Sequence, residues 1–287
     1  MNEKVEALAK IQKQLQYMII AMLIFTIVAF ACAIKFRQYS FVFMLLLLAL
    51  YLFGYRGLVR KYKKGVKTAT MEESFRSFFK NIVYEEKGGA YKKDIIGAPF
   101  LPTEKEENLL IRDTLRGTYQ AKPACIMDVT SDYFTTKTNK DNKVEKTTTF
   151  LSGCYFSIHL RKEFTGSCML WSKNCLEDSA MKRYFAELQQ IDAPNGLAKD
   201  FYLFTPNAEE MPKLSDEFIS ELLRLYEYTP GEVAVQITGD KLRIFIRNRF
   251  LFLRKVEIKY AVSAQMLKAN PFPEMQYLLR VADALQK

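Results

Sequence analysis

The chain has 287 residues, of which 49% are hydrophobic, and a formal net charge of +10. The 220 residues after residue 67 are enough for one sizeable domain, in one or two lobes. The charge is unevenly placed, because residues 1–55 contribute +3, residues 56–67 contribute +6 and residues 68–287 contribute only +1. A nucleic-acid-binding protein usually carries its positive charge on the folded domain, so this distribution argues against a nucleic-acid partner.

Two uncharged apolar runs lie near the N-terminus, at Tyr17–Ile34 and Tyr39–Tyr55. They hold 18 and 17 residues, and a membrane-spanning helix needs about 20, with a lower limit near 17. Tyrosines near the ends of both runs suit the interface between lipid and water. We therefore expect a two-span transmembrane hairpin over 17–55, preceded by a cytosolic amphipathic helix over 1–16. The alternative is a pair of apolar core helices in a soluble protein.

Basic residues flank both runs and are scarce between them. Lys4, Lys10 and Lys13 precede the first run, whereas the connecting loop carries only Lys35 and Arg37. Six more follow the second run, namely Arg56, Arg60, Lys61, Lys63, Lys64 and Lys67. Lysine and arginine accumulate on the cytoplasmic side of a membrane, so both termini are expected in the cytoplasm. The six residues either set only this topology or also contact anionic headgroups at the bilayer surface.

A cleaved signal sequence is the alternative to the first span. The segment 29–32 reads AFAC and is similar to a lipoprotein cleavage box. Glu3 and Glu6 precede the apolar run, however, and a second apolar run follows at once. Both features favour a retained helical hairpin.

A further helix is expected to continue from the basic segment. Thr70 and Glu73 form a T-x-x-E capping box, and apolar residues at helical spacing follow them. The glycines at 88–89 would end this helix, which gives a basic collar and stem helix over 56–87. A second, short helix is expected over 104–115.

From residue 146 the chain alternates between apolar and polar side chains in the manner of a strand. Cys154 and Phe156 fall on one face, whereas Tyr155, Ser157 and His159 fall on the other. A thiol on the apolar face is inert packing material. The single histidine of the chain falls on the wetter face.

Helices and strands alternate in the C-terminal half. A helix is expected over 177–189, a short strand over 200–205 and a helix capped by Ser215, with acidic residues in its first turn. Two further helices are expected at the C-terminus, interrupted by Pro271 and Pro273.

The clearest hairpin lies over 233–247, with the sequence VAVQITGDKLRIFIR. Its apolar residues alternate on both arms, and the central Gly239-Asp240 suits a type II′ turn with glycine first. Antiparallel hairpins interrupted by helices are typical of an α+β fold. We therefore expect a cytosolic α+β domain over 88–287, following the transmembrane helical hairpin.

No known catalytic, cofactor or metal motif occurs in the sequence. There is no phosphate-binding loop, no dinucleotide fingerprint and no zincin motif. The five cysteines are Cys32, Cys125, Cys154, Cys168 and Cys175, without metal-ligand spacing among them. We expect no catalytic, cofactor or metal site. The alternative is a thiol-dependent enzyme in which Cys168 or Cys175 is the nucleophile and His159 the base.

Several landmarks resemble a family of bacterial two-span membrane proteins whose soluble part is a domain of unknown function. They are Phe150-x-x-Gly153-x-x-Phe156, Lys162-x-Phe164-x-Gly166, Leu176-Glu177-Asp178, Phe201-Tyr202-x-Phe204-Thr205 and Asp240-Lys241-Leu242. The resemblance covers most of 68–287, and the N-terminal hairpin also fits. It implies a bacterial inner (cytoplasmic) membrane protein of this architecture, and it brings no activity, cofactor or catalytic residue.

Together these features predict a membrane-anchored binding or scaffolding module at the cytoplasmic face of the membrane. The expected partners are the lipid bilayer with its anionic headgroups, and a membrane protein or a second copy of the chain. A subunit of an oligomeric membrane complex or channel is a further alternative. Two uncharged spans in one copy offer no conducting path, so a channel would need several copies.

Overall fold

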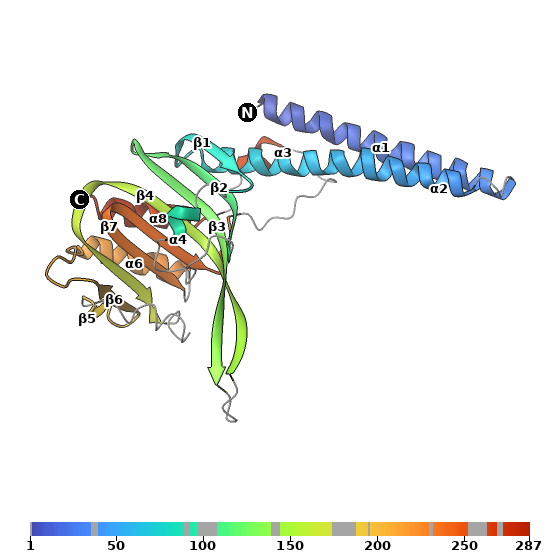
Figure 1. The fold of residues 1–287 in the computed structure, drawn as a ribbon. Helices are drawn as coiled ribbons and strands as arrows, with labels where there is room; N and C mark the ends of the chain where they lie inside the picture. Colours follow the sequence, from blue (N-terminus) through green and yellow to red (C-terminus); the bar gives the residue numbers. More distant parts are fainter. Residues whose placement is uncertain are drawn as a thin grey trace. The chain divides into compact units, whose positions relative to one another are not determined.

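The computed structural model describes residues 2–35, 40–88, 92–96, 108–138, 144–173, 188–194, 196–229, 232–251, 263–268 and 272–287. The chain forms two compact units (Figure 1). One comprises Met1–Ser77 and Arg254–Asn270 and is called the helical unit. The other comprises Phe78–Leu253 and Pro271–Lys287 and is called the sheet unit.

The helical unit is built on two long helical segments that run side by side (Figure 1). The first is α1, a continuous helix over Asn2–Lys35. The second begins as α2 (Ser40–Ala49), passes through the π-helical turn η2 (Leu50–Tyr55) and continues as α3 (Arg56–Phe75). The cytosolic helix expected over 1–16 is therefore not a separate element, because it is the first half of α1.

Both segments are long and apolar enough to cross a membrane, over Glu3–Cys32 and Phe41–Phe75. Only 11% and 0% of their most apolar windows are buried inside the protein. Phe30 is 70% exposed and Phe53 is 86% exposed. A core helix of a soluble protein would bury such side chains, so the exposure argues against that alternative. It fits helices whose apolar surface is covered by lipid.

The first half of α1 packs on α3 through an apolar cluster. Its buried members are Leu8, Leu15, Tyr62, Val66, Ala69 and Leu267. The Lys4 ammonium donates to the Glu72 carboxylate at 2.6 Å on the rim of this contact. The short helix α7 (Ala264–Lys268) supplies Leu267, whose carbonyl oxygen accepts a hydrogen bond from Ser74 at 3.0 Å. The apolar face of the first 16 residues is thus buried against other parts of the same chain.

Two helix predictions are wrong. The helix expected to run to residue 87 ends at Phe75, and β1 (Lys80–Glu85) follows it. The helix expected over 104–115 is replaced, within the part that the structure describes, by β2 (Leu109–Tyr119). In both segments the apolar spacing suits either structure, and pairing between distant strands decides the outcome.

In its described residues the sheet unit contains one antiparallel sheet of seven strands, which confirms the α+β class. Its order is β1-β2-β3-β4-β6-β5, and β7 pairs with β4. The remaining strands are β3 (Lys122–Thr138), β4 (Val144–Ser172), β5 (Gln189–Ile191), β6 (Phe201–Thr205) and β7 (Val233–Arg247). The strand expected over 200–205 is confirmed as β6. Of the helix expected over 177–189, residues 177–187 lie outside the described ranges, and Gln189 belongs to β5.

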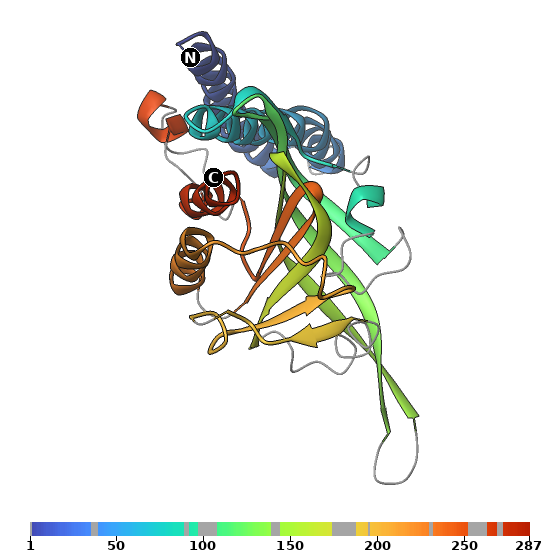
Figure 2. The same cartoon turned by 90° about the vertical axis from the view of Figure 1, so that its left-hand side faces the viewer.

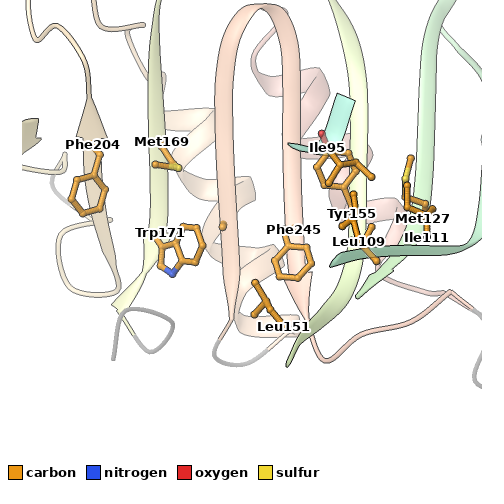
Figure 3. Close-up of a cluster of buried hydrophobic side chains, with 12 residues drawn as sticks. Ile95, Leu109, Ile111, Met127, Leu151, Tyr155, Met169, Trp171, Phe204 and Phe245 are labelled. Carbon is orange, nitrogen blue, oxygen red and sulfur yellow. The ribbon is translucent and has the colours of Figure 1, made fainter. Parts of the chain in front are cut away.

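The hairpin predicted over 233–247 is confirmed. Gly239 has a φ of 55°, as the first turn position requires. At the open end of the hairpin, where the two arms begin and end, the Arg247 amide donates to the Glu232 carbonyl at 3.0 Å. The second arm pairs with residues 153–159 of β4 and the first arm with residues 167–171, so the β7 hairpin lies between these two limbs of β4 (Figure 3).

Helices cover the two faces of this sheet unequally. Two helices, α6 (Asp216–Tyr228) and α8 (Met275–Ala284), pack on one face (Figure 2). As predicted, Ser215 caps α6, because its hydroxyl accepts the Phe218 amide at 3.2 Å. The short helix α4 (Lys92–Ile96) lies against the other face (Figure 2) and adds Ile95 to a buried apolar cluster there (Figure 3).

A glycine allows the close approach of α1 and α3. A Cβ atom at Gly65 would lie 2.7 Å from the Leu8 Cδ2 atom, whereas one at Gly57 would meet nothing within 4 Å. We expect Gly65→Leu to destabilise the packing by about 1–3 kcal/mol. Gly57→Leu, the matched control, should be neutral or slightly stabilising because leucine is the better helix former. Thermal unfolding in detergent micelles measures both, and equal melting temperatures would contradict the packing described.

The β2–β3 turn is tied to α8. The Tyr119 hydroxyl donates to the Asp283 carboxylate at 2.8 Å. Burial, with a smaller contribution from this bond, raises the pKa of Tyr119 from 10.0 to about 12. The folded state therefore favours the neutral phenol, and its stabilising effect is complete below pH 10 and lost as the pH rises towards 12.

Accordingly, the wild type should lose more stability between pH 10 and 12 than Tyr119→Phe does. At pH 8 the variant should be less stable by about 1 kcal/mol, because a hydrogen bond to a carboxylate is removed. Urea unfolding of the full chain at each pH checks both effects. Tyr228→Phe, which keeps the ring that stacks on Tyr277, is the control. Parallel pH curves for wild type and Tyr119→Phe would refute the assignment.

Candidate functional site

A cavity of about 430 Å³ lies on the sheet face that carries Tyr155, Ser157 and His159. It is lined by residues of β1, β2, β3, β4 and the second arm of β7. Along these strands the lining residues alternate with side chains that are fully buried, such as Ile126 and Ile244. The cavity therefore lies on the face opposite α6 and α8.

One row of paired residues crosses five strands and forms the floor of the cavity. It runs from Val83 through Arg116, Cys125 and Ser157 to Arg243, each opposite the next. Directly opposed residues in an antiparallel sheet point to the same face. The two central side chains are small and the two beside them are long. This order of sizes leaves a hollow over the centre and places a guanidinium group on each side of it.

A β-bulge in β2 brings Arg116 to this face. Arg112 is paired with Asp128, and the next paired residue, Leu115, faces Ile126, so the register shifts by one residue. Asp113 lies in the bulge with a φ of 50°. Without the extra residue, regular alternation would turn Leu115 towards the cavity and Arg116 towards the helices.

The bulge is held by hydrogen bonds from β1 and the residues after it. The Asp113 amide donates to the Glu86 carbonyl at 3.2 Å, and the Tyr84 hydroxyl donates to the Asp113 carboxylate. Burial is the largest reason why the pKa of Tyr84 is raised, followed by this hydrogen bond. The phenol therefore stays neutral and can keep donating to Asp113.

Three cationic side chains line the cavity, namely Arg116, Lys241 and Arg243. Arg116 forms an ion pair with Glu85 at 2.8 Å. Arg243 donates instead to the neutral side-chain oxygen of Gln236 at 2.9 Å, so that contact leaves its charge uncompensated.

His159 lies opposite Lys241 in the next row of the cavity. Its Nδ1 atom lies 2.7 Å from the Asp240 carboxylate. The hydrogen bond to His159 is the main reason why the pKa of Asp240 is lowered. Asp240 therefore remains charged and orients the imidazole, which leaves the Nε2 side of the ring for other contacts.

The cavity also has an apolar side. Met127 and Tyr155 line it and are each only 1% exposed. Both belong to the buried cluster under α4 (Figure 3). The accessible apolar surface comes from Val83, which is 42% exposed, and from the exposed Pro123. The cavity therefore combines cationic groups and apolar surface in one volume.

The predicted thiol–histidine pair is not formed by Cys168. This cysteine is 2% exposed, and burial raises its pKa to about 12. It is paired with Ile237 on the helix-covered face, whereas His159 lies on the cavity face. Cys154 is equally inert, since burial raises its pKa well above 9.0. Cys175 lies outside the described residues, and the cysteine that shares the cavity with His159 is Cys125.

The six residues predicted to contact the membrane surface all lie on α3. Arg56, Arg60, Lys61, Lys63 and Lys64 are exposed and Lys67 is half-buried. The other side of this helix buries Tyr62 and Val66 against α1. Contact of the basic side with lipid headgroups stays a prediction. Among the residues that the structure describes, no three or more His, Cys, Asp or Glu side chains are grouped to hold a metal ion.

Comparisons with known proteins yield one similar structure. No family model and no curated protein matches the chain. The chain is similar to the crystal structure of the mycobacterial trehalose monomycolate transport factor A, TtfA, with 9% sequence identity and a TM-score of 0.34. The match covers 76% of this chain and 96% of that chain. A likeness at this level supports no inference about function.

Cys125 offers a direct test of the cavity. The thiol is half-buried in the cavity wall, whereas Cys154 and Cys168 are buried and have raised pKa values. N-ethylmaleimide at pH 8 should therefore modify Cys125 at least tenfold faster than either of the others, because thiolate and access are both needed. Peptide mass spectrometry of the full chain in detergent measures each rate, and denaturant should remove the difference. Equal rates in the folded protein would contradict the geometry.

Proposed function

We propose that the protein is a binding module anchored in the inner membrane of a bacterium by two transmembrane helices, with both termini in the cytoplasm. The sheet unit then lies at the cytoplasmic face and binds a ligand or partner in its cavity. Two observations together support this proposal. The chain has two exposed apolar helices that are long enough to span a membrane, and its sheet unit has a cavity lined by cationic side chains.

The topology is supported by the distribution of charge. The basic residues of α3 follow the second span directly, and the loop between the spans carries only Lys35 and Arg37. This asymmetry favours cytoplasmic termini. Near an anionic bilayer each basic residue adds about 1 kcal/mol of attraction, so the collar also holds the end of α3 close to the lipid surface. The resemblance to two-span bacterial membrane proteins points to the same location.

Binding is favoured over catalysis by the contents of the cavity. The cationic side chains and the small residues between them form a receptacle for negative charge. His159 is already engaged by Asp240, and the buried Cys168 has no access to it. A large pocket with a few convergent polar groups is the usual form of a small-molecule site.

Site-specific crosslinking in membranes tests the binding function. A photoreactive p-benzoylphenylalanine at Val83, in the cavity wall, should give a crosslinked product that mass spectrometry identifies. The matched position is Arg224, an exposed residue on α6 that pairs with Glu221. It lies on a helix that covers the opposite face, and should give none.

The topology and the binding role of the cavity can each be refuted by one result. A C-terminal fluorescent-protein fusion that folds only in the cytoplasm should be bright if the topology is correct, and a dark fusion would refute it. Absence of any product from Val83 in native membranes would refute a binding role for the cavity.

A further inference from the structure

We propose that the cavity binds an amphiphile with one phosphate monoester headgroup and an apolar chain. This deepens the proposed function, because it names the class of ligand for the same cavity. The phosphate lies over Cys125 and Ser157, between Arg116 and Arg243, and the chain lies along Val83 and Pro123.

The headgroup position follows from the register of the strands. Arg116 and Arg243 occupy the same row, with Cys125 and Ser157 between them. Neighbouring strands lie about 4.8 Å apart, so the two arginine Cα atoms are about 14 Å apart. Long side chains extending from both ends can meet an anion held over the middle of this gap. The Ser157 hydroxyl is an additional donor from the floor.

The charge of the site suits a phosphate monoester. Such a group carries about −1.5 to −2 charges near neutral pH and accepts paired hydrogen bonds from guanidinium groups. Glu85 already pairs with Arg116, and Asp240 pairs with His159. Arg243 donates to the neutral Gln236, and Lys241 lies beside it in the cavity and near the charged Asp240. Counted formally, the three cations and the carboxylates of Glu85 and Asp240 leave a net charge of +1 around the hollow, which an anionic headgroup would balance.

The part of the cavity that a phosphate group would not fill is suited to an apolar chain. The cavity measures about 430 Å³, whereas a phosphate group is only a few times the size of a water molecule, which occupies about 30 Å³. The unfilled part is bounded by the exposed apolar side chains of Val83 and Pro123. Covering that apolar surface is favourable in proportion to the area removed from water. A free phosphate would gain none of this.

Other classes of ligand fit the cavity less well. Of the five strands of the floor, β2, β3 and β4 are each paired on both sides, and β1 is the edge strand of the sheet. A peptide strand would therefore add at the outer edge of β1 and not over the hollow. Among the lining residues, Tyr155 is 1% exposed and the imidazole of His159 is held by Asp240, so bases of a nucleic acid find little stacking surface.

Protection of Cys125 from N-ethylmaleimide provides the assay, with the full chain in phosphatidylcholine nanodiscs. The probes are decyl phosphate, inorganic phosphate and decanol at equal concentration. Decyl phosphate should slow labelling at least tenfold, and the other two should slow it less than twofold. Equal protection by inorganic phosphate, or by decanol, would overturn the amphiphile assignment, as would no protection by decyl phosphate.

Matched variants test the role of the arginine. Arg243→Gln should weaken protection by decyl phosphate at least tenfold, and Arg243→Lys should weaken it less. Arg224→Gln, which removes one surface charge on α6, should leave it unchanged. Melting temperatures within a few degrees of the wild type show that each variant is folded. Equal protection in wild type and Arg243→Gln would overturn the headgroup position.

Two further comparisons complete the test. One asks whether the ligand comes from the bilayer or from the aqueous phase, and the other separates a binding role of the cavity from the identity of its ligand. Nanodiscs that contain phosphatidic acid, without added probe, should protect Cys125 if the bilayer supplies the ligand. Protection by decyl phosphate alone would indicate a ligand from the aqueous phase. A polypeptide crosslinked at Val83, without protection by decyl phosphate, would keep the binding function and overturn the amphiphile.

Discussion

The sheet unit depends on the pairing of β4, which forms ladders with β3, with β6 and with both arms of β7. Each ladder assigns side chains to one of two faces, and a shift by one residue would exchange them. Phe156 is thereby directed to the core under α6 and α8, whereas Ser157 and His159 are directed to the cavity. One long strand thus determines the hydrophobic core and the floor of the candidate site together.

The parts of the fold that follow local rules could be predicted from the sequence. Alternation along β4 predicted the faces of Cys154 and His159, and the rules for caps and tight turns predicted the roles of Ser215 and Gly239. The strands β1 and β2 could not be predicted, because their apolar spacing also fits a helix and only pairing with distant residues decides. Arg116 was missed for the same reason, since its place in the cavity depends on the bulge at Asp113.

The candidate site also shows why the net charge of a domain says little about its binding surfaces. Residues 68–287 carry a net charge of only +1, yet three cations line one cavity. Strand pairing brings together charged residues from separate parts of the chain. They create a local field that the net charge of the domain does not reveal. The collar on α3 is the opposite case, because its charges are neighbours in sequence and are visible at once.

The position of β7 between the two limbs of β4 has a consequence for the order of assembly. The limbs are synthesised before residue 173, whereas the hairpin that joins them spans Val233–Arg247. During synthesis the centre of the sheet therefore stays open until Arg247 has been added, with strand edges exposed on both sides. Pairings of such long sequence separation form slowly, and unpaired edges favour aggregation. Under the proposed topology, an early membrane anchor would keep each unfinished sheet tethered at the bilayer and away from others in solution.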